Sequence, residues 1–243
     1  MLITEIYRSI QGESSYTGLP CVFVRLTGCN LRCAWCDSEY TFTGGTRMSV
    51  EEVVERVREI APIGRGRDAH ATAAETAALR SLVEITGGEP MLQEREVVPL
   101  MQRLIADTYT VLIETSGERP LQNVPPEVVK IVDVKCPESG EGGKFRMENL
   151  DALQSHDEIK FVIAGREDYE FAREFTQKHG LSGRVANVIF SPAFRKDASG
   201  QRDSSHCLVD PRELTEWILA DGLNVRLGLQ VHKFVWDPAL KSV

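Results

Sequence analysis

Seven short apolar runs, spread along the chain and separated by helical patterns, limit what this sequence can fold into. The runs are rich in β-branched residues and occupy residues 21–27, 82–86, 109–114, 130–134, 158–163, 187–191 and 224–230. Strands that alternate with helices form a mostly parallel sheet with the helices outside it. The sequence therefore predicts an α/β fold, an incomplete TIM-like (β/α) barrel, in which functional sites form at the carboxyl ends of the strands.

Helical patterns lie between several of these runs. Ser49 and Glu52 fit a capping box that opens a helix with apolar residues along one side. Two later helices are predicted at 169–179 and 211–220, each ended by a glycine. The segment 63–78, with its glycines, arginines and alanines, resembles a surface insertion. We therefore predict one domain, residues 1–243, with an insertion at 63–78.

The composition argues against several classes of protein. The 243 residues carry a net charge of −8, whereas affinity for phosphate groups depends on clustered Lys and Arg. We therefore expect no binding to nucleic acid or to an anionic membrane. The longest apolar runs fall far short of the ~20 residues of a membrane span. The first residues lack the pattern of a secretion signal, and we expect a cytoplasmic protein.

The six cysteines are unevenly spread. Cys29, Cys33 and Cys36 form a C-x3-C-x2-C loop just after a predicted strand, and the other three stand alone. Thiolates at this spacing can converge on one small inorganic core. A [4Fe–4S] cluster held by three cysteines would keep one iron free for a ligand. The alternative is a zinc site completed by a histidine or a distant cysteine. We interpret Cys21, Cys136 and Cys207 as packing or surface residues.

A second motif joins the cysteine loop. Residues 86–90 read Thr-Gly-Gly-Glu-Pro, directly after the next predicted strand. Alone, this motif could be a turn in which Pro90 begins a helix. Together, the C-x3-C-x2-C loop and the Gly-Gly-Glu-Pro motif resemble the radical S-adenosylmethionine superfamily. The resemblance implies an incomplete barrel of the radical S-adenosylmethionine type, a [4Fe–4S] cluster, and reductive cleavage of S-adenosylmethionine to a radical that abstracts hydrogen.

Further motifs resemble one family within this superfamily, the 7-carboxy-7-deazaguanine synthases. The Gln-Gly-Glu sequence at 11–13 is the first of them. Others follow in the family's order at 18–20 (Gly-Leu-Pro), 22–25 (Val-Phe-Val-Arg), 28–30 (Gly-Cys-Asn), 35–38 (Trp-Cys-Asp-Ser), 113–117 (Ile-Glu-Thr-Ser-Gly) and 230–234 (Gln-Val-His-Lys-Phe). The resemblance implies contraction of 6-carboxy-5,6,7,8-tetrahydropterin to 7-carboxy-7-deazaguanine with loss of ammonia, in queuosine biosynthesis. It also implies a homodimer that uses S-adenosylmethionine and Mg²⁺.

The resemblance assigns a set of residues to the pterin substrate. They are Ile10, Gln11, Gly12, Glu13, Arg25, Thr86 and His232. The chemistry suits a pterin, because a carboxylate such as Glu13 can accept two N–H bonds from its amino-pyrimidine edge, and a guanidinium can hold a substrate carboxylate in a two-pronged contact. The alternatives are a plain turn at 11–13, a salt bridge from Arg25 to an internal acid, and a structural His232.

Another set matches the family's contacts to S-adenosylmethionine at the strand ends. It comprises Gly88, Glu114, Asp133, Val134, Lys135, Ser191, Pro192, Ala193 and Phe194. Lys135 could meet the methionine carboxylate, and the acids could accept amino or hydroxyl hydrogens. Charged residues at strand ends are often merely solvated, which is the alternative here.

Ser38 matches a position where the family more often has threonine, and the resemblance makes its hydroxyl a Mg²⁺ ligand. Mg²⁺ prefers oxygen ligands and keeps several waters. Asp37 could assist through water or through hydrogen bonds to the ligands, or both residues could simply cap the loop. We expect a reducing protein such as flavodoxin as electron donor.

The chain departs from the family at its C-terminus, where it continues past Pro238 for five residues. Family members can end soon after the histidine, with their terminal carboxylate near the substrate, so this contact is doubtful here. Two other functions were weighed. A glycyl-radical activating enzyme would share the cysteine loop but would not need the Gln-Gly-Glu sequence or Arg25. A non-catalytic Fe–S or zinc module would not need Gly-Gly-Glu-Pro.

Overall fold

The fold is known from a computed structural model that describes residues 1–61, 81–195, 204–237 and 240–242. The insertion predicted at 63–78 lies outside the described residues. Within them, the strands are β1 (Leu2–Ile10), β2 (Pro20–Leu26), β3 (Thr46–Arg47), β4 (Leu82–Gly87), β5 (Thr110–Thr115), β6 (Val129–Asp133), β7 (Glu158–Ile163), β8 (Asn187–Pro192) and β9 (Arg226–Leu227). In the described part of the chain, no helix has the length and apolar character needed to cross a membrane.

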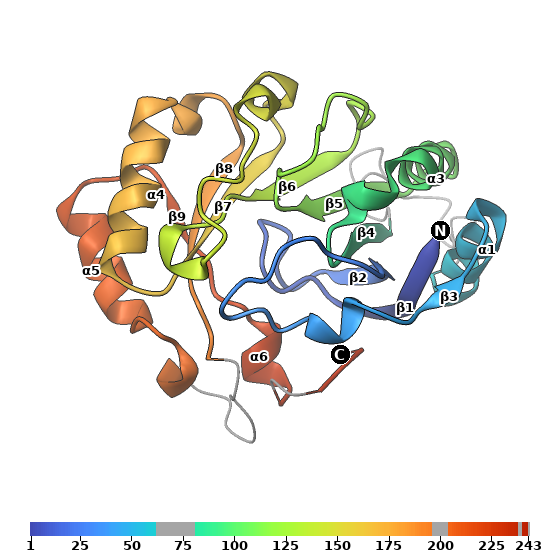
Figure 1. Cartoon of the computed structure of the whole chain (residues 1–243), viewed down its shortest axis with the longest axis horizontal. Coiled ribbons are helices and arrows are strands. Elements are labelled where there is room, and N and C mark those ends of the chain that lie inside the picture. The colour runs from blue at the N-terminus through green and yellow to red at the C-terminus, as the bar shows by residue number, and fades with distance from the viewer. Residues whose placement is uncertain (62–80, 196–203, 238–239, 243) are drawn as a thin grey trace, which may run out of the picture.

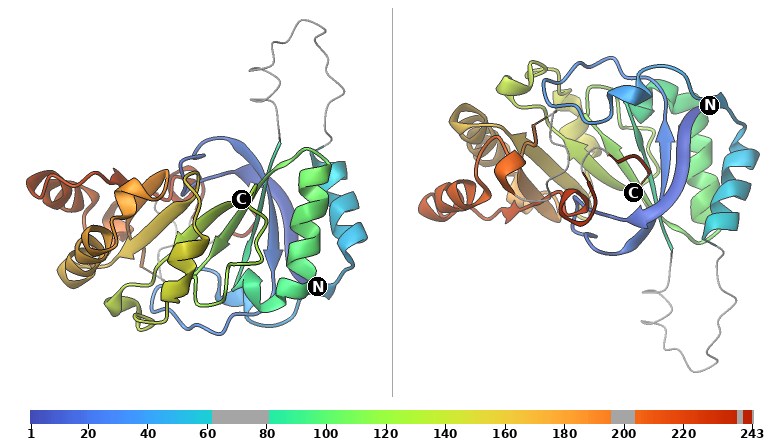
Figure 2. Two further views of the ribbon diagram at one scale, coloured as in Figure 1. Left: turned by 90° about the horizontal axis from the view of Figure 1, so that it is seen from above. Right: turned by 90° about the horizontal axis from the view of Figure 1, so that it is seen from below.

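The strands form one sheet in the order β3-β1-β2-β4-β5-β6-β7-β8-β9. From β2 to β9 every neighbouring pair is parallel, and β1 pairs antiparallel with both β2 and β3. Because β3 and β9 do not pair with each other, the sheet curves without closing (Figures 1 and 2). The predicted incomplete (β/α) barrel is therefore confirmed.

Five helices accompany the sheet in the described residues: α1 (Val50–Ile60), α3 (Glu94–Ala106), α4 (Arg166–Lys178), α5 (Pro211–Ala220) and the short α6 (His232–Val235). The capping box at the start of α1 is confirmed, since Ser49 Oγ accepts from the Glu52 amide and the Glu52 carboxylate accepts from the Ser49 amide. Helices α1 and α3 cover one end of the sheet and α4 and α5 the other, all on its outer face (Figure 2).

Two strand predictions need correction. Strand β1 was not predicted, so β2, expected to be the first strand, is the second. Glu5 and Arg8 interrupt the apolar pattern of β1 because its side chains lie mostly part-exposed near the sheet edge. The strand expected at 224–230 shortens to β9, since Gly228 bonds to Phe190 of β8 but Val231 turns away to bond with Gly12. Strands β2 and β4–β8 match their predictions to within one residue at each end.

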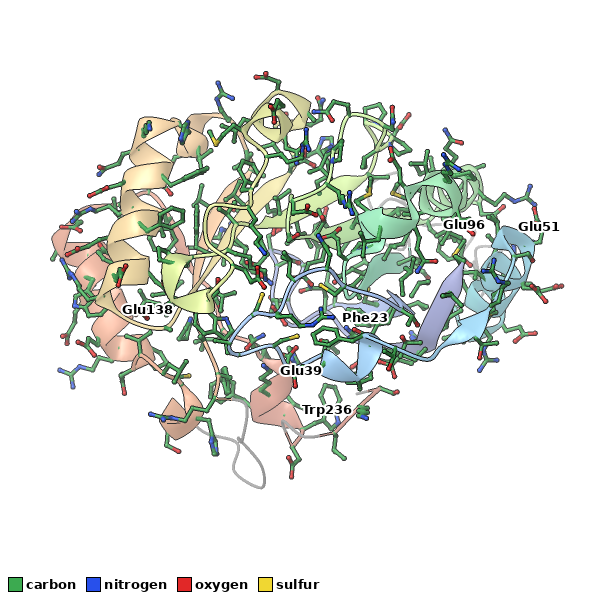
Figure 3. The ribbon with its side chains drawn as sticks, in the orientation of Figure 1. Phe23, Glu39, Glu51, Glu96, Glu138 and Trp236 are labelled. Atoms are coloured by element: carbon green, nitrogen blue, oxygen red, sulfur yellow. The ribbon has the colours of Figure 1, made fainter. Side chains whose placement is uncertain are left out.

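The two faces of the sheet differ in chemistry. Alternate residues of the strands, among them Val24, Ile85 and Ile113, face the outer helices and belong to the main apolar core. The opposite face is apolar near the strand starts, where Cys21, Phe23 and Leu82 pack together (Phe23 is labelled in Figure 3). Toward the carboxyl ends it turns polar. The residues there are Arg25, Glu84, Thr86, Glu114, Asp133 and Lys160.

Candidate active site

One cavity of about 230 Å³ opens at the polar, carboxyl ends of the strands. Every residue predicted to bind substrate lines it, as do the three clustered cysteines and Ser38. The structure thus brings together segments from both ends of the chain, because the carboxyl ends of parallel strands share one edge of the sheet. The cavity has a cysteine end, with Cys29, Cys33 and Cys36, and a charged end, with Glu13, Glu84 and Lys160.

Cys29, Cys33 and Cys36 are free thiols, each partly exposed to the cavity. Burial raises the pKa of all three, that of Cys33 to about 11, while the nearby Lys135 ammonium lowers each of them. Among the described residues, no three His, Cys, Asp or Glu side chains are grouped so as to hold a single metal ion. Three adjacent thiols beside a cation are a donor set that fits an iron–sulfur cluster.

The Gly-Gly-Glu-Pro turn packs directly on the cysteine loop. A Cβ atom added to Gly88 would lie 2.2 Å from the carbonyl oxygen of Gly28 and 2.8 Å from Cys29 Cβ, so a glycine is required there. The Glu89 amide donates to the same Gly28 carbonyl at 2.9 Å. The two motifs are therefore a single packed unit, which explains why both appear in the sequence.

Glu89 itself has a structural role. Its buried carboxylate accepts hydrogen bonds from the Met91 amide, the Thr115 hydroxyl, and both the amide and hydroxyl of Ser116, at 2.6–3.0 Å. These bonds tie the end of β4 to the end of β5. A carboxylate with four donors is fully engaged, and it fixes the turn that carries Gly88.

The Gln-Gly-Glu turn is shaped by the side chain of Gln11. Its Oε1 accepts from the amides of Glu13 and Ser14 at 2.8 Å each, and its Nε2 donates to buried Glu84 at 3.1 Å. A Cβ on Gly12 would meet Nδ1 of His232 at 2.3 Å, so the glycine lets the turn pack against α6. The turn at 11–13 and the histidine at 232 are therefore neighbours.

A buried lysine organises the charged end. Lys160 on β7 is 2% exposed, and its Nζ lies 2.8 Å from Glu13 Oε2, in contact with Glu114, and 3.8 Å from Asp133. Burial raises the pKa of Glu13, but Lys160 and then His232 outweigh this and bring it down to about 2. The same acids raise the pKa of Lys160 far above its usual value against the effect of burial. Glu13 and Lys160 are therefore both ionised at neutral pH.

Glu84 differs from Glu13 in that its pKa is raised. It is 1% exposed, lines the cavity, and accepts a hydrogen bond from Gln11. Burial, and then the charge of Glu114, raise its pKa to about 8. A buried acid next to other acids keeps its proton because the neutral form avoids both desolvation and repulsion. The charged end therefore contains a neutral carboxyl, Glu84, near the ionised Glu13.

Arg25 forms the ion pair that was weighed as an alternative to substrate binding. Its Nε lies 2.8 Å from Glu5 Oε1, and its Nη2 donates to the Tyr7 hydroxyl at 2.8 Å. The Tyr40 hydroxyl also donates to Glu5 Oε1 at 2.8 Å. Within the described part of the chain no hydrogen bond occupies Nη1. Arg25 lines the cavity, so it is both held by Glu5 and open to a ligand.

Asp37 and Ser38 meet a lysine of α6. Asp37 Oδ2 lies 2.6 Å from Lys233 Nζ, and the Ser38 hydroxyl donates to Asp37 Oδ1 at 2.8 Å. Burial acts to raise the pKa of Asp37, but Lys233 holds it well below its usual range. Lys233 also donates to Gln230, whose amide donates to Glu13. One hydrogen-bonded chain thus links Ser38 to the Gln-Gly-Glu turn.

The residues predicted to contact S-adenosylmethionine divide into two groups. Gly88, Glu114, Asp133, Lys135 and Phe194 line the cavity. Val134, Ser191, Pro192 and Ala193 are buried and are not among the lining residues. Asp133 bonds to Lys135 through Oδ2 at 2.7 Å, whereas its buried Oδ1 has no hydrogen-bond partner in the described part of the chain. A buried orphan acceptor at the cavity wall fits a ligand that brings an N–H or O–H group.

Several residues of the site were missed from the sequence. They are Glu5, Tyr7, Tyr40, Glu84, Lys160 and Gln230. Lys160 carried a usable signal, since a lysine inside an apolar strand must have a buried partner. Glu5 and Tyr7 were missed with strand β1, and nothing local in the sequence distinguishes Tyr40.

Comparisons with known proteins first define the class. The Radical SAM superfamily model matches residues 23–133, which include the cysteine loop and the Gly-Gly-Glu-Pro turn. The crystal structure of QueE from Escherichia coli has the same fold, with a TM-score of 0.67 at 24% identity over 94% of this chain and 92% of that one. SuiB from Streptococcus suis, solved with S-adenosylmethionine, shares the fold more loosely, with a TM-score of 0.52 at 12% identity over 85% of this chain and 46% of that one.

The family follows from sequence relatives. The 7-carboxy-7-deazaguanine synthase of Koribacter versatilis is 68% identical over all 243 residues of this chain and 100% of its own length. That of Chlorobaculum tepidum is 38% identical over 99% of this chain and 96% of its own length. The chain belongs to the 7-carboxy-7-deazaguanine synthase family of the radical S-adenosylmethionine superfamily.

Proposed function

We propose that the chain converts 6-carboxy-5,6,7,8-tetrahydropterin to 7-carboxy-7-deazaguanine with loss of ammonia, a step of queuosine biosynthesis. The observation that carries the proposal is that one cavity is lined by the three free cysteines, by the Gln-Gly-Glu turn and by Arg25. These features serve an Fe–S cluster, a pterin edge and a carboxylate respectively. A member of this family needs all three in one place.

The cofactors have fitting residues around the cavity. Cys29, Cys33 and Cys36 would hold the [4Fe–4S] cluster, and the lining group of Gly88, Glu114, Asp133, Lys135 and Phe194 would contact S-adenosylmethionine. Together these cofactors supply a radical strong enough to abstract hydrogen from carbon. Lys135 suits the methionine carboxylate, and Asp133 Oδ1 is an acceptor in need of a donor. We assign backbone contacts to buried Val134, Ser191, Pro192 and Ala193.

The pterin would lie at the charged end. Glu13 is ionised and held in place by Lys160 and Gln230, so it can accept N–H bonds from the amino-pyrimidine edge without reorienting. Ile10, Gln11 and Gly12 would add backbone contacts, and Thr86 and His232 would complete the wall. Because Gln11 is occupied by the Glu13 and Ser14 amides, its side chain shapes the turn and does not itself read the ligand.

Arg25 would hold the substrate carboxylate. Its Nε and Nη2 are used by Glu5 and Tyr7, which fix the plane of the guanidinium before any ligand arrives. Nη1 is then the nitrogen available to the substrate, and a positioned charge in a partly dry cavity binds a carboxylate more firmly than a free one.

Mg²⁺ is proposed to bind at Ser38 when substrate is present. A hydroxyl is too weak a ligand by itself, since Mg²⁺ releases its bound waters reluctantly and prefers octahedral coordination by six oxygens. Asp37 is engaged by Lys233 and Ser38, so we assign it the role of orienting the hydroxyl. Substrate oxygens and waters would complete the coordination.

The assembly and the electron donor are further proposals. We infer that the enzyme acts as a homodimer in the cytoplasm and accepts electrons from a reducing protein such as flavodoxin. The cytoplasmic location is supported by the cysteines, because all six are free thiols, as is typical of a reducing compartment. The homodimer and the donor follow from family membership alone.

The deciding experiment is incubation of the cluster-loaded protein with reductant, S-adenosylmethionine and 6-carboxytetrahydropterin under anaerobic conditions. Mass spectrometry should show 7-carboxy-7-deazaguanine and released ammonia. Arg25→Ala should lose the product yet keep slow cleavage of S-adenosylmethionine, because it removes a substrate contact and leaves the cysteine end intact. Cleavage of S-adenosylmethionine without any pterin product in the wild type would instead favour a glycyl-radical activating enzyme, and no cleavage would favour a non-catalytic module.

A further inference from the structure

The C-terminal tail, residues 240–242, lies against the cavity. Leu240, Lys241 and Ser242 are lining residues, together with Asp237 just after α6. Figure 2 shows the C-terminal end inside the curve of the sheet, and Figure 3 places Trp236, just after α6, on the same side of the molecule as Glu39. Residues 240–242 are therefore part of the cavity wall.

Two contacts attach the tail to the residues around Arg25. The Ser242 hydroxyl donates to Glu5 Oε2 at 2.5 Å, and Lys241 Nζ lies 4.4 Å from the centre of the Tyr40 ring. The other oxygen of Glu5 accepts from both Arg25 and Tyr40. The tail and Arg25 thus share one carboxylate and one aromatic ring.

Lys241 brings a charge that this end of the cavity needs. Glu5 neutralises Arg25, so Arg25 by itself would not balance the charge of a substrate carboxylate bound beside it. Among the described residues, Lys241 forms no ion pair, and its contact with the face of Tyr40 leaves the ammonium free to bind an anion. With Lys241 included, two cations would face two carboxylates.

We propose that Lys241 is a second recognition residue for the substrate carboxylate at the Arg25 end of the cavity. The proposal rests on the proposed function, which places a carboxylated pterin against Arg25. It makes Lys241 a specificity residue: the gain in affinity should apply to pterins that carry a carboxylate at C6 and not to those that lack it.

The test compares two stable ligands on cluster-loaded, unreduced protein with S-adenosylmethionine, so that no turnover occurs. Calorimetry would give Kd values for 6-carboxypterin and for pterin, which lacks the carboxylate. Lys241→Met should weaken the binding of 6-carboxypterin by about fivefold, equal to about 1 kcal/mol. The effect is small because the ammonium is exposed to solvent at the edge of the cavity. Pterin should bind unchanged. Lys241→Arg should retain the preference, and Lys178→Met, an exposed lysine on α4, should change neither ligand.

The outcomes separate this proposal from the proposed function. If the wild type binds both ligands equally, the carboxylate site at Arg25 itself is wrong. If the wild type prefers 6-carboxypterin and Lys241→Met keeps the full preference, Lys241 is not a recognition residue although the function stands. Equal weakening of both ligands would mean that Lys241 only packs the tail on Tyr40. An effect that shrinks at high salt would support the charge interaction.

Discussion

The two ends of the cavity are built in different ways. At the cysteine end, close backbone packing does the positioning: Gly88 lies against Gly28 and Cys29 with no room for a side chain. At the charged end, ion pairs between residues far apart in the sequence position the side chains. Lys160 on β7, for example, binds Glu13, which lies in a turn 147 positions earlier. The first arrangement depends on short motifs and the second on the assembled sheet.

This difference says where each end is vulnerable. Removing a thiol removes a ligand from the cysteine end but leaves no buried charge unpaired. Removing Lys160 leaves three acids, Glu13, Glu114 and Asp133, without their shared cation in a place that is nearly dry. We therefore expect changes at the cysteine end to affect chemistry more than stability, and changes at the charged end to affect both.

The largest effect should come from Cys33→Ala. Anaerobically loaded wild-type protein should be brown and carry about four irons per chain, and the variant should lose the colour and the cleavage of S-adenosylmethionine. The checks are iron analysis, the visible spectrum and product detection. Cys21→Ala is the matched control, because Cys21 is buried at the start of β2 and does not line the cavity. Full iron content in Cys33→Ala would exclude Cys33 as a ligand.

Lys160→Met tests the charged end directly. It should lower the free energy of unfolding by about 3–5 kcal/mol, because the buried acids lose their partner. Lys130→Met is the control: Lys130 forms a buried pair with Asp157 at 2.9 Å away from the cavity, and its loss should destabilise by a similar amount. Urea unfolding measures both variants.

The two lysine variants should differ in ligand binding. Calorimetry should show that Lys160→Met loses affinity for 6-carboxypterin, whereas Lys130→Met binds it normally at a temperature where the variant is folded. Equal loss of binding in both would mean that Lys160 supports the fold in general and has no particular part in placing Glu13.

Glu84→Gln should change how stability depends on pH. The Glu84 carboxyl titrates near 4.5 in the unfolded chain and near 8 in the folded protein, so the folded state binds more protons between these values. The stabilisation that Glu84 contributes to the free energy of unfolding is fully present below pH 4.5 and is lost as pH rises through 8. From pH 5 to 8 the wild type should lose at least about 1 kcal/mol of unfolding free energy relative to Glu84→Gln.

The control for this pH effect is Glu55→Gln, at an exposed position of α1, which should follow the wild type at every pH. Chemical denaturation at a series of pH values gives the comparison. Parallel curves for the wild type and Glu84→Gln would show that Glu84 titrates normally, and the neutral acid at the charged end would have to be abandoned.

The smallest effect concerns Ser38, which stands between the two ends. Mg²⁺ should raise turnover of the carboxypterin while leaving the affinity for S-adenosylmethionine nearly unchanged. Ser38→Ala should remove most of this stimulation, and Ser38→Thr should preserve it because the hydroxyl remains. Turnover assays across a Mg²⁺ titration measure this. Equal stimulation in the wild type and Ser38→Ala would leave Asp37 as the candidate ligand.

Much of the fold could be predicted because buried parallel strands are continuous apolar runs, and β2 and β4–β8 carry that signal. Strand β1 lacks it, since its pattern is mixed with Glu5 and Arg8. Most of the predicted site residues that line the cavity belong to short motifs whose spacing is visible in the sequence, whereas Asp133, Lys135 and Phe194 lie outside these motifs. Val134 and residues 191–193, which were assigned from the family's contacts at strand ends, are buried and are not lining residues of the cavity.

By itself, the sequence determined the incomplete barrel, the clustering of the three thiols and the family, because each rests on local patterns: apolar periodicity, thiol spacing and glycines where the backbone comes close. Only the tertiary structure decided which charges meet. In the structure, Lys160 forms ion pairs with Glu13 and Glu114, and Arg25 forms one with Glu5. The C-terminal tail contacts Tyr40 through Lys241. The physical reason is that an ion pair depends on distance in space, and parallel strand ends bring together residues that are far apart along the chain.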